Sequence, residues 1–175
     1  KNAPNRETAR RNLGLEEADE VLLFLGNLTA QKRPDRFIEI VQKLTKTWPH
    51  LKALIVGDGL LRKGLENQVS SVKYQESGIK YQEVREKTSN IRNLTHDILF
   101  TGYQQDVSSY LAAADLLILT SDTEGLPGVV LEAGFFRVPT VASEVGGIRE
   151  CLIDRESGVL VPDRSVDGFV KEINF

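Results

Sequence analysis

The chain has 175 residues, of which 41% are hydrophobic and 27% are charged, and these proportions exclude wholesale disorder. A formal net charge of −3 gives no support for a nucleic-acid surface, which would need a clustered basic excess, so no nucleic-acid partner is expected. The single cysteine cannot form an internal disulfide, which suits a reducing compartment, and the two histidines offer no zinc-type ligand spacing.

Apolar segments of strand length alternate with segments of helical periodicity along the chain. A continuous apolar run at 21–25, closed by Gly26, is typical of a strand buried on both faces. A helix is expected at 34–46, where apolar side chains recur on one helical face. The later expected elements are strands at 51–56, 98–100, 116–119, 139–142 and 158–161, and helices at 60–69, 107–114, 127–136, 148–153 and from Val166 onward.

This alternation predicts a parallel sheet with helices on both faces. We therefore expect one α/β domain, doubly wound, with a mostly parallel Rossmann-like sheet of about six strands. Residues 72–93 depart from the pattern as a polar helical insertion, in which a four-residue sequence at 73–76 is echoed at 80–83. Two copies fall short of a coiled coil, so a solvated surface helix or insertion is the simpler interpretation.

Both ends of the chain have the character of cuts in a longer sequence. The chain starts at Lys1 rather than at a methionine, and no signal peptide follows. At the other end, a helical apolar stripe that starts at Val166 stops at Phe175, after about two turns. We expect this chain to be part of a longer protein. Its longest apolar runs are too short to span a bilayer.

In open parallel sheets, ligands bind beyond the carboxyl ends of the strands. The loop that follows the first strand carries Lys32 and Arg33 just before a helix expected to begin at Pro34. The helix dipole disfavours each cation there by about 0.3–1 kcal/mol, and a bound anion reverses that effect. Phosphate is the natural candidate. From these residues alone, two side chains extended into water remain an equal alternative.

The loop after the fourth strand places Glu124 just before a helix that is expected to have Pro127 at its first position. Gly125 and Gly128 lack Cβ atoms where an approaching ligand would need room. A carboxylate near a helix N-terminus also stabilises the helix dipole without any ligand. Stabilisation of the helix dipole by Glu124 is therefore the structural alternative to a role in binding.

Glu132 lies among apolar residues in the same helix, which is expected to pack into the sheet. A buried carboxylate needs hydrogen-bond donors, because leaving it unpaired costs several kcal/mol. A vicinal diol supplies two hydroxyl donors, as ribose does in nucleotide sites. The alternatives are a capping carboxylate or an internal ion pair, with Arg137 or Arg149 as partner.

Together these segments resemble the C-terminal domain of the retaining glycosyltransferases of family 4, which share the GT-B architecture of two facing Rossmann-like domains. The resemblance runs from about Val21 to Val161. Its weight rests on the Glu-x7-Glu spacing of Glu124 and Glu132 with a Gly-Gly pair downstream. The other matching segments are Gly26-Asn27-Leu28 with Lys32, Val56-Gly57-Asp58-Gly59, Phe100-Thr101-Gly102, Ala114-Asp115-Leu116 and Val145 through Glu150.

The resemblance implies a role for each matching residue. Glu132 would hold the ribose hydroxyls of the donor nucleotide, and Glu124 would lie at the donor sugar. Lys32 would contact the diphosphate and is, with Glu124, the catalytic candidate. The remaining implied substrate-binding residues are Gly125, Leu126, Pro127, Gly128 and Val129 near the sugar and phosphate, and Gly102 and Tyr103 near the base.

The first loop departs from the family pattern at one position. The family usually carries an arginine where this chain has Asn27, which can donate a hydrogen bond but brings no charge. Arg33 could compensate from the other side of Lys32. Both Asn27 and Arg33 are therefore counted among the expected substrate-binding residues.

The resemblance implies the donor-binding half of a retaining glycosyltransferase. The expected donor is a nucleotide-diphosphate sugar, UDP-type by preference, and the acceptor a glycan or lipid-linked glycan, with no catalytic metal and no other cofactor. The N-terminal domain that would hold the acceptor is absent, so we expect nucleotide binding without efficient transfer. The alternatives are a non-catalytic nucleotide-binding or interaction module of the same fold, or an epimerase or phosphorylase. The expected location is cytoplasmic, with peripheral attachment of the whole enzyme to the cytoplasmic membrane face as an option.

Overall fold

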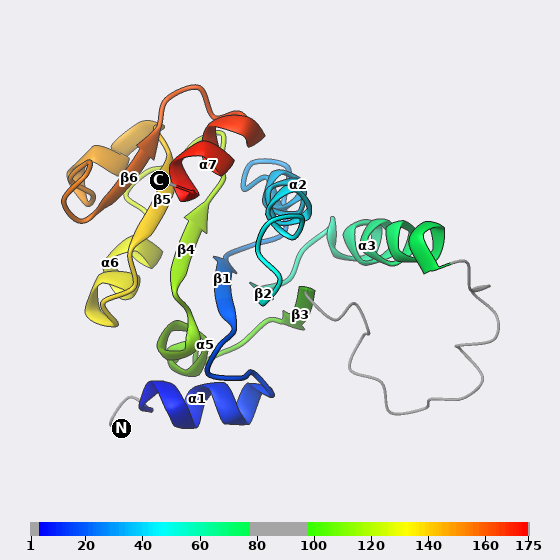
Figure 1. Ribbon diagram of the computed structural model, residues 1–175. Coiled ribbons are helices and arrows are strands. Elements are labelled where there is room, and N and C mark those ends of the chain that lie inside the picture. The colour runs from blue at the N-terminus through cyan, green and yellow to red at the C-terminus, as the bar shows by residue number, and fades with distance from the viewer. Residues whose placement is uncertain (1–3, 78–97, 175) are drawn as a thin grey trace.

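The computed structural model describes residues 4–77 and 98–174. Its centre is a six-stranded sheet in which every pairing is parallel, in the order β3-β2-β1-β4-β5-β6 (Figure 1). The order reverses direction between β1 and β4, as in doubly wound nucleotide-binding folds. The strands are β1 (Glu20–Leu25), β2 (Leu51–Val56), β3 (Ile98–Gly102), β4 (Leu116–Leu119), β5 (Thr140–Ser143) and β6 (Gly158–Val161).

Helices cover both faces of the sheet, which confirms the predicted doubly wound α/β fold. Side chains alternate along β1, so Leu22 and Phe24 enter one core while Val21 and Leu23 enter the other. The first core lies under α2 (Pro34–Leu44), α3 (Arg62–Ser77) and α7 (Val166–Ile173). The second lies under α5 (Ser108–Ala113) and α6 (Gly128–Phe135). A 3₁₀ helix, η1 (Gly146–Glu150), follows β5.

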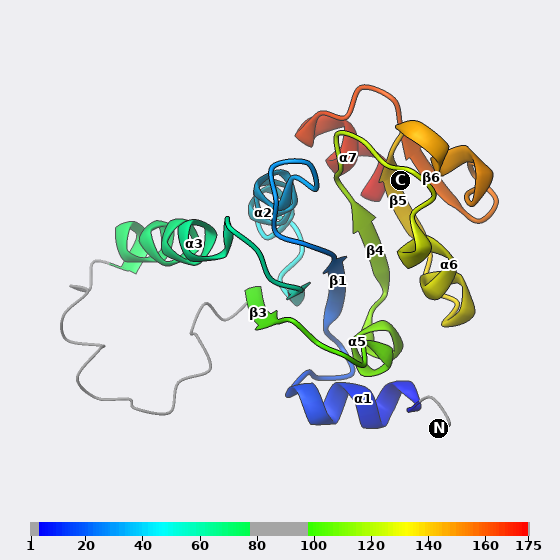
Figure 2. The same cartoon turned by 180° about the vertical axis from the view of Figure 1, so that it is seen from behind.

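A helix that the sequence did not predict, α1 (Arg6–Leu13), lies across the amino ends of the central strands (Figures 1 and 2). Asn5 caps its first turn by accepting from the N–H of Thr8, and Gly14 ends it in the left-handed conformation. The buried Arg10 side chain anchors the helix, because it donates to the carbonyl of Ala113 and pairs with Asp115. Polar contacts, rather than a broad apolar face, hold this helix against the rest of the protein. A search for apolar periodicity in the sequence therefore does not detect it.

Several element boundaries differ from the predictions. Pro127 is extended, with φ −75° and ψ 100°, and precedes α6 as its N-cap, so the expectation that it occupies the first helical position is wrong. The helix predicted at 148–153 is instead the 3₁₀ helix that begins at Gly146. Helix α3 continues to Ser77, so the start of the predicted 72–93 helical insertion is indeed helical. Positions 78–93 of that insertion, including its second sequence copy, lie outside the described residues.

Across residues 4–77 and 98–174, we find no helix that combines the length and the apolar character needed to cross a membrane.

Candidate active site at the carboxyl edge of the sheet

The loops after β1 and β4 are joined by hydrogen bonds into one surface. The N–H of Asp122 donates to the carbonyl of Gln31 at 2.9 Å, and the Gln31 side-chain amide donates to the carbonyl of Thr123 at 3.1 Å. The Thr120 hydroxyl donates to the carbonyls of Lys32 and Arg33 at 3.0 and 2.8 Å. Because β1 and β4 are the neighbours at which the strand order reverses, this surface occupies the position where such sheets bind ligands.

Lys32 and Glu124, the two predicted catalytic residues, meet on this surface. The Lys32 Nζ atom lies 2.7 and 2.8 Å from the two carboxylate oxygens of Glu124. The Ser121 hydroxyl donates to the same carboxylate at 2.6 Å. The Glu124 side chain is only 5% exposed, whereas that of Lys32 is 27% exposed. The ion pair was not predicted, and it means that each charge is neutralised by the other in this ligand-free state.

Among the described residues, no side chain accepts a hydrogen bond from the first turn of α6, so Glu124 does not cap that helix through a hydrogen bond. The first backbone N–H groups of α6 are likewise not capped by a side chain, so they and the positive end of the helix dipole remain available to an anion.

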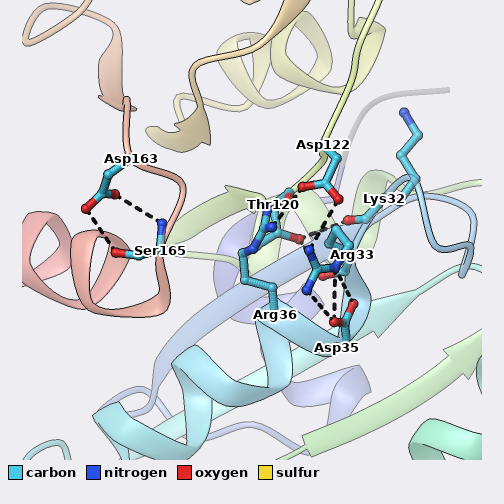
Figure 3. A network of polar contacts seen from close by, with 8 residues as sticks. All are labelled: Lys32, Arg33, Asp35, Arg36, Thr120, Asp122, Asp163 and Ser165. Atoms are coloured by element: carbon cyan, nitrogen blue, oxygen red, sulfur yellow. Dashed lines mark hydrogen bonds and ion pairs between the residues drawn. The ribbon is translucent and has the colours of Figure 1, made fainter.

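Arg33 is held by internal carboxylates. Its guanidinium donates to both oxygens of Asp35, at 2.7 to 3.0 Å, and to Asp122 at 3.2 Å (Figure 3). The hydrogen bond to Asp35 raises the pKa of Arg33 above its ordinary value. Figure 3 also shows the Lys32 side chain extending away from this cluster. In this ligand-free state Arg33 is therefore paired with Asp35 and Asp122, as Lys32 is paired with Glu124.

Asp122 gives this cluster a predicted dependence on pH. Burial acts to raise the pKa of Asp122, but hydrogen bonds from Arg36 and Arg33 outweigh it and hold the pKa below its ordinary value. A depressed carboxyl pKa adds stability above about pH 4 that disappears as pH falls through the folded-state pKa. Since the Asp122 side chain is 43% exposed, solvent screening limits this contribution to about 1 kcal/mol or less.

We therefore expect Asp122→Asn to have a lower melting temperature than the wild type at pH 7. The difference between the two melting temperatures should become smaller as the pH approaches 3. Thermal unfolding followed by circular dichroism between pH 3 and pH 7 measures this. A difference that stays constant across the range would contradict the role of an ionised Asp122.

Glu132 differs from its predicted setting. It is exposed on α6, because Val130 and Ala133 are the residues of that helix that pack inward. The expectation of a buried carboxylate is therefore wrong. Within the described residues, no hydrogen bond or ion pair engages its side chain, and the suggested partner Arg149 pairs with Glu144 instead. The carboxylate is open to a ligand without any internal bond having to break.

Two pairs of glycines lie near Glu124, Gly125 with Gly128 and Gly146 with Gly147, and only the second pair is required by packing. Among the described residues, a Cβ atom on Gly125 or Gly128 would meet no atom within 4 Å beyond its chain neighbours and local helix backbone, so packing does not require either glycine. A Cβ on Gly146 would lie 1.8 Å from the Glu124 carbonyl oxygen, and the N–H of Gly147 donates to the carbonyl of Gly125 at 3.1 Å. The Gly-Gly pair therefore holds the Glu124 loop in place, while the space around the first pair is open.

The remaining predicted residues lie at the same edge. Tyr103 and Leu126 are 75% and 59% exposed in the loops after β3 and β4, and Asn27 is exposed after β1. Gly102 has a φ of 74° and accepts a hydrogen bond from the N–H of Gly57, which joins the loops after β2 and β3. A neighbouring cavity of about 320 Å³ is lined by Ala30, Arg33, Asp35, Leu61, Gly64 and Leu65. Its lining includes neither Lys32 nor Glu132, so their convergence on one pocket stays a prediction.

Three residues of this surface were missed by sequence reasoning: Ser121, Asp122 and Arg36. Ser121 could have been found, because it lies three positions before Glu124 and its hydroxyl reaches back to that carboxylate. Arg36 gave no signal, because it lies in a helix whose pattern is otherwise that of a buried face.

Comparison with known proteins places the chain in a family. Residues 5–175 match the model of the family described as Glycosyl transferases group 1. The chain is 31% identical over 147 residues to the GalNAc-α-(1→4)-GalNAc-α-(1→3)-diNAcBac-PP-undecaprenol α-1,4-N-acetyl-D-galactosaminyltransferase of Campylobacter jejuni, and the match covers 83% of this chain and 35% of the relative. It is 29% identical over 164 residues to the UDP-Gal:α-D-GlcNAc-diphosphoundecaprenol α-1,3-galactosyltransferase of Escherichia coli. That match covers 92% of this chain and 37% of the relative.

Solved structures share the fold. WaaG, a glycosyltransferase involved in lipopolysaccharide biosynthesis, superposes with a TM-score of 0.76 at 24% identity, over 99% of this chain and 42% of that one. HepE of Anabaena, solved with UDP and glucose, superposes with a TM-score of 0.70 at 25% identity, over 96% and 41%. The chain thus spans well under half the length of these proteins. Because the family match covers nearly all of it, the chain belongs to the group 1 glycosyl transferases.

Proposed function

We propose that this chain is the donor-binding domain of a glycosyltransferase that uses a nucleotide-diphosphate sugar. The observation that carries the proposal is the meeting of Lys32 and Glu124 at 2.7 Å, at the point where the strand order reverses. An ammonium and a carboxylate side by side there suit a diphosphate and a sugar hydroxyl. The printed donor of the Escherichia coli relative, UDP-Gal, and the UDP in the HepE structure support a UDP-type donor.

The roles follow the geometry of the loops. Lys32 moves from Glu124 to the diphosphate and offsets the negative charge that develops on the leaving group. The uncapped start of α6 faces the same anion with its N–H groups, and the open space around Gly125 and Gly128 admits the sugar and phosphate. Glu124, once released, accepts from the donor sugar. This arrangement supplies positive charge from the protein, so we propose that no metal is needed.

Outside this loop pair, Glu132 accepts from the ribose hydroxyls, and the loop of Gly102 and Tyr103 lies against the base. Since Asn27 brings no charge and Arg33 is bound to Asp35 and Asp122, Lys32 contacts the diphosphate without help from an arginine of its own loop. We therefore expect a UDP affinity that is modest and strongly dependent on this one lysine.

The whole protein's activity is proposed by extension. We infer transfer with retention of anomeric configuration, as in family 4, to a glycan or lipid-linked acceptor held by an N-terminal Rossmann-like domain of the same protein. A cytoplasmic enzyme attached peripherally to the membrane would suit such acceptors. The second candidate, a non-catalytic module of the same fold, is favoured by one observation, which is that Lys32 and Glu124 already satisfy each other without a ligand.

Isothermal titration of the chain with UDP, GDP and ADP at millimolar concentration tests the proposal. We expect saturable heat with UDP, weaker heat with the purine nucleotides, and no change when EDTA is added. A titration without heat for any of the three would reject donor binding and leave the non-catalytic module. Binding that EDTA abolishes would reject the metal-independent site.

A further inference from the structure

We propose that Asp122 and Arg36 are positioning residues that hold Lys32 and Glu124 in register while a donor is bound. This inference rests on the proposed function, and neither residue is assigned any contact with the donor. It accounts for a charged pair that the catalytic roles above do not use.

Arg36 is a cation on the buried face of α2. Its side chain is only 10% exposed, and its neighbours Phe37 and Ile38 are fully buried. Burying a guanidinium costs several kcal/mol unless it is paired, and an apolar side chain would fill such a position without that cost. Within the described part of the chain, its side chain makes two hydrogen bonds, and both go to the loop after β4: to the Thr120 carbonyl at 2.6 Å and to Asp122 at 2.8 Å.

Asp122 connects that loop to the other side of the site. One carboxylate oxygen accepts from Arg36 and the other accepts from Arg33 (Figure 3). The backbone N–H of Asp122 donates to the Gln31 carbonyl. Arg33 and Gln31 are the two neighbours of Lys32 in the chain. Asp122 therefore touches both sides of the proposed phosphate-binding lysine without touching the lysine side chain itself.

The same network reaches Glu124. Arg36 holds the carbonyl of Thr120, whose hydroxyl in turn holds the carbonyl of Lys32, and Asp122 lies two residues before Glu124. The backbones that carry Lys32 and Glu124 are thus tied together independently of their own ion pair. When a diphosphate takes Lys32 away from Glu124, that ion pair is lost but the network remains. It keeps the ammonium and the carboxylate placed for the donor, which lowers the cost of ordering them on binding.

A double-mutant cycle tests this by isolating the coupling between Asp122 and Lys32. UDP affinity is measured by titration calorimetry for the wild type, Asp122→Asn, Lys32→Ala and the double variant. We expect Asp122→Asn to weaken UDP binding about three- to tenfold when Lys32 is present and less than twofold when it is absent. Uridine, which lacks the diphosphate, should bind both Lys32-containing proteins alike.

The control is Asp167→Asn, which breaks an ion pair with Lys43 between α2 and α7, away from the two loops. It should leave the UDP affinity unchanged. If Asp122→Asn does not fold, Arg36→Lys takes its place in the same double-mutant cycle. It keeps the charge but loses the paired geometry, and it should show the same dependence on Lys32. A loss that is equal with and without Lys32, or equal for uridine and UDP, overturns the positioning role and leaves the donor site standing. A wild type that does not bind UDP overturns the donor site itself.

Discussion

Replacing Lys32 by methionine should both destabilise the protein and remove most of its affinity for UDP. The substitution leaves the Glu124 carboxylate, 5% exposed, with the Ser121 hydroxyl as its only remaining side-chain donor among the residues that the structure describes. An uncompensated buried charge costs about 3–5 kcal/mol, and access of water through the partly exposed Lys32 position reduces this to about 2–3 kcal/mol. For a domain of this size, the melting temperature should fall by about 5–10 °C.

The second variant separates stability from binding. In Lys32→Met with Glu124→Gln, the carboxylate is replaced by a neutral amide that can still accept from Ser121. We expect its melting temperature to recover to within about 2 °C of wild type, since no buried charge remains. UDP binding should not recover, because a charge-assisted hydrogen bond to phosphate is worth about 1.5–3 kcal/mol, or roughly 10- to 150-fold in affinity.

Thermal denaturation and titration calorimetry on the same samples measure both effects. Lys43→Met is the matched control, because it removes a lysine from an exposed ion pair with Asp167 and should change stability by less than about 1 kcal/mol. A double variant that binds UDP as tightly as wild type would show that Lys32 does not contact the diphosphate.

The fold was predictable because its determinants are local and repeated. Each buried strand is a short apolar run that ends near a glycine or polar residue, and α2 and α7 each show an apolar face of helical period. Helix α1 is anchored instead by Arg10 and Asp115, which are 105 residues apart in sequence. No local pattern reports a contact of that separation, and so the helix was missed.

For the site, the sequence motif predicted which residues take part but not how they pair with one another. Lys32 and Glu124 were both identified, but a spacing cannot show that two charges 92 residues apart neutralise one another. The pairing of Arg33 was missed for the same reason, since one of its partners, Asp122, comes from a different strand loop. Glu132 was misjudged because its apolar neighbours suggested burial, whereas the direction of α6 turns Val130 and Ala133 inward and Glu132 outward.

Because Glu132 points outward, we expect Glu132→Ala to weaken UDP binding without changing the stability of the fold. The exposed carboxylate has no partner within the described residues, so its removal should change the free energy of unfolding by less than about 0.5 kcal/mol. Hydrogen bonds from ribose hydroxyls to a charged acceptor are worth about 1.5–3 kcal/mol, so UDP should bind roughly 10- to 150-fold more weakly. Glu39→Ala, an exposed glutamate on α2, is the matched control and should bind UDP normally.

A ligand change identifies the contact behind this loss. Wild type should bind 2′-deoxy-UDP about five- to tenfold more weakly than UDP, because one of the two hydroxyl donors is missing. Glu132→Ala should bind the two nucleotides equally, since the group that distinguishes them is gone. Titration of both ligands into both proteins gives the comparison. If the variant still prefers UDP by the wild-type factor, the ribose hydroxyl is held by another group, and the assignment of Glu132 to the ribose fails even though its removal weakens binding.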